Sequence, residues 1–347
     1  MFFKNKEIQK RKPDEISIII SSDDNYAPYV GVTVQSIIEN SSKNLPYTIY
    51  ILDGDISKTN KKLLNKIQTH NVKITYIDMK SYMKNINLSL FYIYNHFKLA
   101  SYFRFFIPII FKNFEKIIYC DCDGIFKDNI AKLNDIDMKE YWIGAVKDTY
   151  VNILLKNPEM FPYFKNTLNL QNPENYFQAG LLIMNIKELI KHNFTNKCIK
   201  TLKILQKPKY VDQCILNSVC QNNVLFLDNS WNVESPVIRD INKNRDTLPE
   251  EFCETYLNAY NNPKFIHYCG PKKPWNTQKT YNSEKFWEYA RRTPFFSKTK
   301  KSGKKKLKPV PIYQKIFSVK NSTDKRHKVL TIMGVKIKFR KKQEKTK

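Results

Sequence analysis

Short apolar runs alternate with amphipathic stretches along the first 80 residues of the chain. The runs at 16–21, 47–52 and 72–77 are rich in isoleucine, tyrosine and valine, which is typical of buried strands. Between them, residues 29–39 and 57–69 place apolar side chains at helical spacing. The order strand, helix, strand, helix, strand predicts a parallel, Rossmann-like sheet.

The same alternation continues through residue 290 without a visible internal repeat. A helix over residues 98–111 carries Arg104, and an apolar strand over 116–120 leads directly into Asp121. The other predicted elements are strands at 179–185, 224–227 and 265–267 and a helix at 212–220. We expect a basic lead-in over residues 1–13, one folded domain over 14–296, and a lysine-rich linker with a basic, aromatic tail over 297–347.

Glycine is scarce, with eight residues in 347. The chain contains no GxGxxG, no GxxxxGK[ST] and no GxSxG sequence. These motifs bind phosphate or present a nucleophile through glycine-rich turns. If the protein binds phosphate, a metal and side chains must replace backbone amides.

Signals for membrane insertion and export are missing from the sequence. No stretch reaches the roughly 18 uncharged apolar residues that a spanning helix needs. The first residues lack the apolar segment of a signal peptide. The seven cysteines include no CxxC pair, which fits a reduced compartment. We therefore expect a cytoplasmic protein.

The formal net charge of +27 is concentrated at the C-terminal end. Residues 298–347 hold nineteen lysines and arginines against two acidic residues, or +17, which leaves +10 for residues 1–297. Apolar and aromatic residues accompany the lysines at 312–317 and 335–339, which favours binding to an anionic membrane surface. The alternatives are a disordered, solvated tail and a nucleic-acid-binding protein. Nucleic acid binding leaves the motifs below unexplained, so no nucleic acid partner is expected.

The strongest candidate for chemistry is Asp121-Cys122-Asp123 at the end of a buried strand. Two carboxylates at this spacing suit Mg²⁺ or Mn²⁺, which prefer hard oxygen ligands and keep positions open for phosphates. Such pairs also occur in plain solvated turns. Here the preceding strand is bulky and apolar, and Gly124 allows a close turn, so a binding site is favoured.

A second candidate begins with His267 at another predicted strand end. Its imidazole can complete a metal site, although a packed core histidine is the more common role. Gly270 permits a close backbone approach, and Lys273 offers a positive charge to a phosphate. Trp275, further along, reads as a core or lid residue.

Cys120 and Cys122 raise the alternative of a zinc site. A structural zinc site needs four ligands, and no second closely spaced pair of cysteines or histidines follows. We therefore expect no zinc.

Taken together, these segments resemble glycosyltransferase family 8, in particular the bacterial galactosyl- and glucosyltransferases of lipooligosaccharide and lipopolysaccharide synthesis. Six segments occur in the family's order between residues 16 and 290. They are Asp23-Asp24-Asn25-Tyr26, Ser101-Tyr102-Phe103-Arg104, Tyr119-Cys120-Asp121-Cys122-Asp123, Phe177-Gln178-Ala179-Gly180, Asp212-Gln213 and His267-Tyr268-Cys269-Gly270-Pro271-Lys272-Lys273-Pro274-Trp275. The resemblance implies an α/β protein with a GT-A fold, a single Rossmann-like mixed sheet flanked by helices and followed by the basic C-terminal tail.

The resemblance also implies a role for each matching residue. The uracil and ribose of a UDP-sugar are expected at Asp23, Asn25 and Tyr26. Mn²⁺, or alternatively Mg²⁺, is expected at Asp121, Asp123 and His267, with Cys122 beside it. The diphosphate is expected at Gly270 and Lys273. The donor sugar and reaction centre are expected among Arg104, Gln178, Asp212 and Gln213.

The family retains the anomeric configuration, and no carboxylate nucleophile has been settled for it. We therefore assign none, since the amide of Gln213 is a poor nucleophile. The better-known members carry asparagine where Gln178 stands and often aspartate where Cys214 stands. These two differences lie next to expected sugar contacts, so the hexose and the acceptor stay open.

The function expected from the sequence is transfer of galactose or glucose from a UDP-hexose to a saccharide or glycolipid acceptor in lipooligosaccharide assembly. The enzyme would lie in the cytoplasm, peripherally on the inner face of the cytoplasmic membrane. A chain that binds a UDP-sugar without transferring it is a further alternative, although the intact carboxylates and histidine argue against it.

Overall fold

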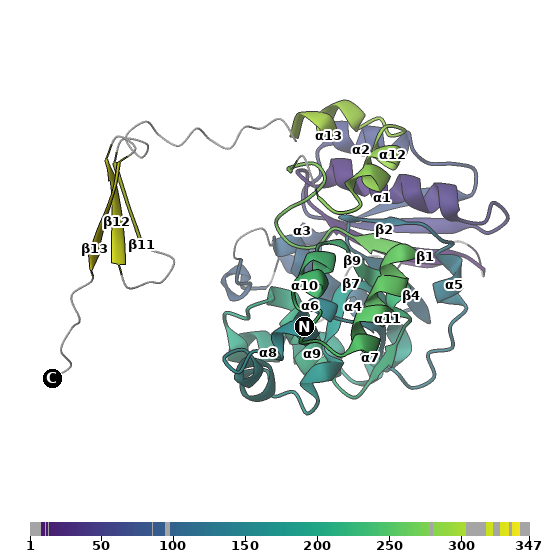
Figure 1. Cartoon of the computed structure of the whole chain (residues 1–347). Coiled ribbons are helices and arrows are strands. Elements are labelled where there is room, and N and C mark those ends of the chain that lie inside the picture. Colours follow the sequence, from purple (N-terminus) through teal and green to yellow (C-terminus); the bar gives the residue numbers. More distant parts are fainter. Residues whose placement is uncertain are drawn as a thin grey trace. The chain divides into compact units, whose positions relative to one another are not determined.

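The computed structural model describes residues 8–10, 12, 14–84, 86–93, 98–277, 280–302, 317–321, 327–332 and 335–340. Most of the predicted N-terminal lead-in and residues 312–316 of the tail lie outside them. The chain divides into one unit that ends at Thr299 and a second that begins at Lys300 (Figure 1).

A seven-stranded sheet with the order β3-β2-β1-β4-β7-β6-β8 forms the centre of the first unit. Its strands are β1 (Ile16–Ser22), β2 (Tyr47–Asp53), β3 (Val72–Asp78), β4 (Lys116–Cys120), β6 (Ile143–Lys147), β7 (Phe177–Asn185) and β8 (Val224–Phe226). Strands β3, β2, β1 and β4 are parallel, whereas β7 runs antiparallel to β4 and β6. The predicted mixed sheet is confirmed. The parallel arrangement predicted from the first three strands extends to β4 and ends there. An apolar run carries no mark of its direction, so the reversal was not visible in the sequence.

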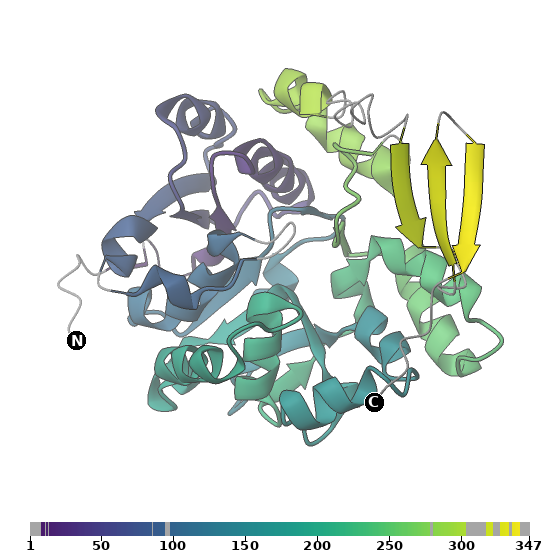
Figure 2. The ribbon, with the colours of Figure 1, turned by 90° about the vertical axis from the view of Figure 1, so that its left-hand side faces the viewer.

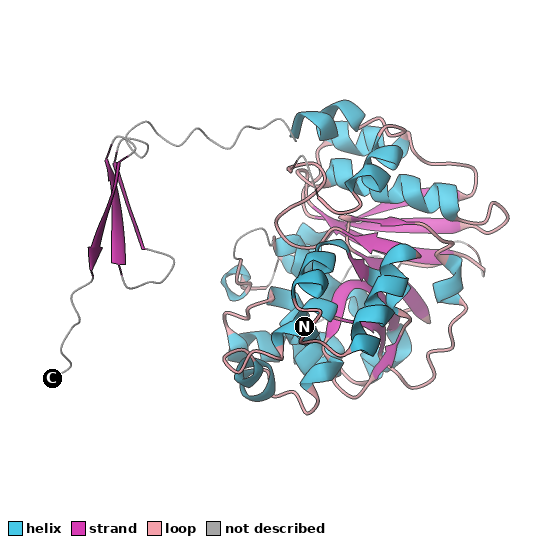
Figure 3. Cartoon of the chain, in the orientation of Figure 1, coloured by secondary structure: helices cyan, strands magenta, loops and turns pink. Residues whose placement is uncertain are grey.

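Strand β1 is buried along its whole length because helices cover both faces of the sheet (Figure 3). Ile18 and Ile20 pack into the cluster that contains Val30 and Val34 of the first helix. Ile19, which points the opposite way, belongs to a second cluster on the other face. Near-continuous apolar runs are the expected pattern of strands covered on both sides.

Thirteen α-helices occur among the described residues. They are α1 (Ala27–Asn40), α2 (Lys58–Asn65), α3 (Met79–Met83), α4 (Ile107–Ile110), α5 (Ala131–Asn134), α6 (Thr149–Leu154), α7 (Ile186–Lys191), α8 (Phe194–Leu205), α9 (Val211–Cys220), α10 (Ile238–Lys243), α11 (Glu250–Asn261), α12 (Ser283–Ala290) and α13 (Phe296–Ser302). None of them combines the length and hydropathy that a membrane crossing requires.

Two helices differ from their predicted extent. The helix predicted over 98–111 is a 3₁₀ helix, η2 (Leu99–Phe106), followed by the short α4. Pro108 lies in the first turn of α4 and has no N–H to continue an α-helical ladder from η2. Helix α2 ends at Asn65 rather than near residue 69, because the N–H groups of Lys66, Ile67 and Gln68 bond to carbonyls three residues back and the α-helical ladder stops.

A small second sheet joins three distant parts of the first unit. Strand β10 (Phe265–His267) lies between β5 (Gly124–Phe126), to which it is antiparallel, and β9 (Val233–Glu234), to which it is parallel. The register pairs His267 with Gly124 on one side and with Glu234 on the other. This pairing places His267 directly beside the turn that follows β4.

The C-terminal unit contains β11 (Phe317–Asn321), β12 (His327–Ile332) and β13 (Val335–Arg340), which pair antiparallel in sequence order (Figure 2). Residues 297–302, which the sequence assigned to the linker, belong to helix α13. The first unit therefore extends into this helix, to Thr299.

Candidate functional site

The candidate site lies at the edge of the large sheet where β1 and β4 end. Because these strands are parallel, with Ile18 opposite Ile118, the residues that follow them emerge at the same edge. Strand β7 begins at this edge because it runs the other way, with Cys120 opposite Leu181. The edge collects Asp23, Asp121 and Gln178 from separate parts of the sequence.

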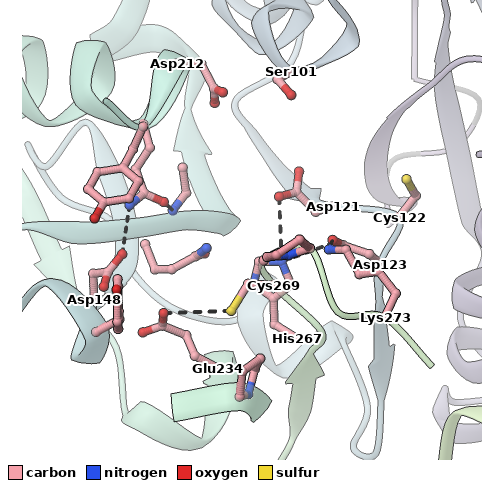
Figure 4. Close-up of a pocket in the computed structure, with 18 of the residues that line it drawn as sticks. Ser101, Asp121, Cys122, Asp123, Asp148, Asp212, Glu234, His267, Cys269 and Lys273 are labelled. Carbon is pink, nitrogen blue, oxygen red and sulfur yellow. Dashed lines mark hydrogen bonds and ion pairs between the residues drawn. The ribbon is translucent and has the colours of Figure 1, made fainter. Parts of the chain in front are cut away.

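The small sheet brings His267 to the two aspartates (Figure 4). Its Nε2 atom lies 3.1 Å from Oδ1 of Asp123 and 3.8 Å from Oδ2 of Asp121. The backbone N–H of Tyr268 donates to the carbonyl of Asp123 at 2.9 Å, which ties β10 to the turn. Gly124 is required here, because a Cβ at this position would overlap the ring of Phe265.

The side chain of Asp123 is 13% exposed and lies between Lys273 and His267. Lys273 Nζ contacts its Oδ2 and also donates to the carbonyl of Tyr268 at 2.7 Å. Burial alone would raise the pKa of Asp123, but Lys273 and His267 together hold it well below the usual value. The carboxylate is therefore ionised across the physiological pH range.

Arg104 is the cationic partner of Asp121. The guanidinium is 3% exposed and lies 2.7 Å from Oδ1 of Asp121 and 3.1 Å from Oδ2 of Asp212. It also lies over the ring of Tyr119, whose hydroxyl donates to Asp121 at 2.8 Å. One buried cation thus holds the carboxylates of β4 and α9 in fixed positions.

Asp121, Asp123 and His267 form a group that fits a divalent metal. One ligand atom from each lies within 4.8 Å of the others, and no other such group of three or more acidic, histidine or cysteine residues occurs in the described part of the chain. Two carboxylates and an imidazole nitrogen suit Mn²⁺ or Mg²⁺. Cys120 and Cys122 are buried free thiols outside this group. The donor set does not correspond to a cysteine-rich zinc site.

A cavity of about 500 Å³ opens above this group. Twelve of the residues named from the sequence line it: Asp23, Tyr26, Arg104, Asp121, Cys122, Asp123, Gln178, Asp212, Gln213, His267, Gly270 and Lys273. Asn25 is exposed and does not line the cavity. Trp275 stacks on Tyr29 with the ring centres 3.7 Å apart, and it is a buried core residue rather than a lid.

Gly270 has a backbone reason to be glycine. Its φ angle of +75° lies in the left-handed region, which a side chain disfavours. Apart from Gly270 and its two chain neighbours, no described residue has a heavy atom within 4 Å of the position that a Cβ would take. The backbone is therefore open on this side, as close approach of a ligand requires.

Sequence reasoning missed two carboxyl groups that line the same cavity. Asp148 caps helix α6 and accepts a hydrogen bond from Gln213 Nε2 at 2.8 Å. Glu234 accepts the backbone N–H of Thr149 at 2.7 Å. Burial raises the pKa of Asp148 to about 6, and burial together with Asp148 raises the pKa of Glu234 well above its usual value.

The pKa of Asp212 is also raised. Burial raises its pKa to about 7 against the opposing effect of Arg104. Asp148 directly follows β6. Polar residues that follow buried strands often mark a binding site, so recognising β6 in the sequence would have identified Asp148 as a candidate. Glu234 lies on a two-residue strand with no comparable local signal.

The structure corrects the interpretation of Cys214. Its thiol does not line the cavity but lies among Tyr163, Tyr176 and Tyr210. The sulfur is 3.4 Å from the Tyr163 hydroxyl, 3.3 Å from the Tyr176 hydroxyl and 3.3 Å from the Tyr210 backbone nitrogen. Asp212 and Gln213 both line the cavity, whereas Cys214, about 100° further around α9, does not.

Comparison with known proteins agrees with this geometry. Residues 17–279 match the profile of the family described as Glycosyl transferase family 8. The chain belongs to this family. It is a glycosyltransferase with the GT-A fold, as its likeness to solved glycosyltransferase structures also indicates.

Two relatives and one solved structure illustrate the family likeness. A putative glycosyltransferase of Haemophilus influenzae is 33% identical over 265 residues, which are 75% of this chain and 73% of the relative. The lipopolysaccharide 1,3-galactosyltransferase of Salmonella typhimurium is 25% identical and covers 92% of this chain and 89% of its own. The apo structure of the bifunctional glycosyltransferase WbbM is 30% identical, with a TM-score of 0.75, and the match spans 86% of this chain and 53% of that one.

Proposed function

We propose that this glycosyltransferase is a retaining, Mn²⁺-dependent hexosyltransferase that moves galactose or glucose from a UDP-sugar to a saccharide acceptor of lipooligosaccharide. The observation that carries the proposal is the group of Asp121, Asp123 and His267 beside Lys273 at the cavity. The similarity to a lipopolysaccharide galactosyltransferase supports the choice of hexose and acceptor.

For the donor, we assign the uracil and ribose to Asp23, Asn25 and Tyr26 at the end of β1. Tyr26 lines the cavity, and Asp23 Oδ1 accepts the Tyr26 backbone N–H at 3.0 Å, which leaves its second oxygen available. Asn25 is exposed, so its contact with a nucleotide would form at the rim.

The diphosphate is assigned to the wall that carries the metal group. Asp121, Asp123 and His267 would hold Mn²⁺, which supplies positive charge to the diphosphate and to the UDP that leaves. Lys273 provides a further positive charge at the same place, and the open backbone at Gly270 admits a phosphate. Arg104 pairs with Asp121 and fixes the orientation of its carboxylate.

At the reaction centre we assign Gln178, Asp212 and Gln213. Gln213 is held at both ends, since its oxygen accepts the Ala179 N–H at 2.9 Å and its nitrogen donates to Asp148. Asp212 is ion-paired with Arg104. Neither offers a free nucleophile, which agrees with front-face substitution assisted by the departing diphosphate, and we assign no covalent intermediate.

The experiment that tests the proposal is a Mn²⁺-dependent hydrolysis and transfer screen with UDP-galactose, UDP-glucose and their N-acetyl forms. Hydrolysis of one preferred UDP-hexose, lost with EDTA and restored with Mn²⁺, is the expected result. Turnover that is indifferent to EDTA removes the metal assignment, and binding of every donor without turnover removes transferase activity. The configuration of the product, read by NMR, tests retention.

We also propose that the C-terminal unit binds an anionic membrane surface. The three strands of this unit pair antiparallel in sequence order. The sequence of these strands mixes lysine and arginine with aliphatic and aromatic residues, and residues 298–347 carry a net charge of +17, which fits an anionic membrane surface. Each basic residue near such a surface contributes about 1 kcal/mol.

A chain that ends at Ser302 keeps helix α13 and removes all of the second unit except its first three residues. Sedimentation with vesicles of phosphatidylcholine and phosphatidylglycerol should fall sharply for this variant while donor turnover persists. Vesicles of phosphatidylcholine alone are the control for charge. Equal sedimentation of the full and shortened chains removes the membrane proposal and leaves the transferase proposal intact.

A further inference from the structure

Asn232 is a buried residue beside the metal group that no motif of the sequence marked. It is 3% exposed and ends the 3₁₀ helix η5 (Asn229–Asn232), immediately before β9. The pairing of β9 with β10 sets Val233 opposite Ile266, which brings Asn232 close to His267. Its position is therefore determined by the same small sheet that delivers His267 to the aspartates.

The Asn232 side chain connects two residues of the site. Its Oδ1 lies 3.2 Å from Nδ1 of His267, on the ring edge opposite the aspartates. Its Nδ2 donates to Oε1 of Gln178 at 2.8 Å. Gln178 Oε1 also accepts the backbone N–H of Gly180. The result is a continuous buried chain from Gly180 through Gln178 and Asn232 to His267.

The backbone N–H of Gly180 fixes the orientation of every side chain in this series of hydrogen bonds. A backbone N–H can only donate, so the Gln178 atom that faces Gly180 must be its oxygen. Because that oxygen accepts, the Asn232 atom that faces it must be the amide nitrogen. The Asn232 oxygen then faces His267, so Nδ1 of the histidine must carry a hydrogen to donate. A neutral imidazole with its proton on Nδ1 has its lone pair on Nε2.

Nε2 is the atom that faces Asp121 and Asp123, and a metal ligand needs that lone pair. We infer that Asn232 is a positioning residue that holds His267 in the tautomer competent to bind the metal, with the Gly180 N–H setting the direction of the whole chain. The inference rests on the proposed metal site and adds to it a residue outside the recognised motifs.

The same series of hydrogen bonds determines which polar group of Gln178 is available to a ligand. Two donors occupy its Oε1, so its Nε2 amide hydrogens are the group left for the cavity that Gln178 lines. The sugar position beside Gln178 therefore receives a hydrogen-bond donor and must present an oxygen acceptor. In the members that carry asparagine at this position, the side chain is one methylene shorter.

The test compares Mn²⁺ binding by two variants of the full chain, measured from the EPR signal of free Mn²⁺ with no sugar donor present. Asn232→Leu keeps the approximate side-chain volume but removes the acceptor for Nδ1, and its affinity for Mn²⁺ should fall about 10- to 100-fold. Asn232→Asp keeps an oxygen toward Nδ1 and should bind Mn²⁺ within about threefold of the wild type. Asn258→Leu, an exposed position on α11, is the matched control for the substitution itself.

A folded Asn232→Leu protein with wild-type Mn²⁺ affinity overturns the inference. If this variant does not fold, an Asn232→Asp protein that folds but binds Mn²⁺ more than tenfold more weakly overturns it instead. Wild-type protein that binds Mn²⁺, with the expected order of the variants, but transfers no sugar would support the inference and remove the proposed function. Thermal unfolding of each protein separates loss of the fold from loss of the metal ligand.

Discussion

The acidic residues on the two sides of the cavity differ in whether a cation pairs with them. On the metal side, Asp121 contacts Arg104 and Asp123 contacts Lys273, so each carboxylate is compensated by a cation. On the other side, Asp148 and Glu234 are buried and form no ion pair among the described residues.

The difference teaches which chemistry each side favours. Carboxylates that stay charged can bind a metal and tolerate a diphosphate next to their cations. Carboxyl groups whose pKa is raised by burial hold a proton more readily and hydrogen-bond to uncharged partners, such as the hydroxyls of a sugar. The cavity is therefore divided between a charged side suited to the leaving nucleotide and a more neutral side suited to saccharide.

The largest expected effect comes from breaking the charged side at its centre. Asp123→Asn removes a proposed metal ligand and the carboxylate that pairs with Lys273. Transfer measured with Mn²⁺ and the preferred UDP-hexose should fall at least about a thousandfold, because several kcal/mol of charge stabilisation is lost. Circular dichroism should report an intact fold. Wild-type turnover in this variant, or turnover that resists EDTA, would contradict the metal assignment.

Arg104 tests the cost of leaving the carboxylates uncompensated. Arg104→Met leaves Asp121 and Asp212 without their shared cation and should lower the free energy of unfolding by about 3 to 5 kcal/mol in urea titrations. The exposed ion pair of Arg292 with Glu39 provides the matched control. Arg292→Met should cost about 1 kcal/mol or less. Similar losses for the two variants would show that the buried arginine has no special structural role.

The neutral side is tested by pH. Burial raises the pKa of Asp148 to about 6, above its value of about 3.9 in an unfolded chain, so the folded protein favours the protonated form. That contribution is present at low pH and is lost as the pH rises through 6. Asp148→Asn stays neutral and can still cap α6, so relative to wild type its stability should rise by about 1.4 kcal/mol between pH 5 and pH 8. A stability difference that does not change with pH would refute the raised pKa.

The smallest expected effect is a change in donor preference at Gln178 but not at Cys214, the two positions where this chain differs from better-known members of the family. Gln178→Asn shortens a side chain that lines the cavity and should change the preference between UDP-galactose and UDP-glucose by about 1 kcal/mol, or roughly fivefold. Cys214→Ser should leave that preference unaltered, because the thiol lies in a tyrosine cluster outside the cavity. Ratios of kcat/KM for the two donors measure both. A changed preference in Cys214→Ser would assign that residue an indirect role in sugar selection.

The charged side was readable from the sequence because its residues follow strong local patterns. Asp121 and Asp123 follow an apolar strand, and Lys273 lies in the segment that begins with His267. The strands that present them were placed to within a residue or two. Local pattern sufficed because each strand end is determined mainly by its own apolar run.

Other residues in and around the site could not be read from the sequence, because their positions depend on pairing and packing between distant segments. Asn232 acquires its partner only when β9 meets β10, and β9 is two residues long. Asp148 follows β6, whose run of Ile143, Gly144 and Ala145 is too small and mixed to stand out. Cys214 was misplaced since its direction depends on the packing of α9, which the sequence next to Gln213 does not specify.

The distribution of the cysteines offers a chemical handle on the cavity. Cys269 lines it and is partly exposed, whereas the other six thiols are buried. A small alkylating reagent applied to the native protein should therefore reach Cys269 before the other thiols, but slowly, because burial raises the pKa of this thiol well above its usual value. Because this residue adjoins Gly270, the rate of labelling would report occupancy of the proposed diphosphate position without any engineered probe.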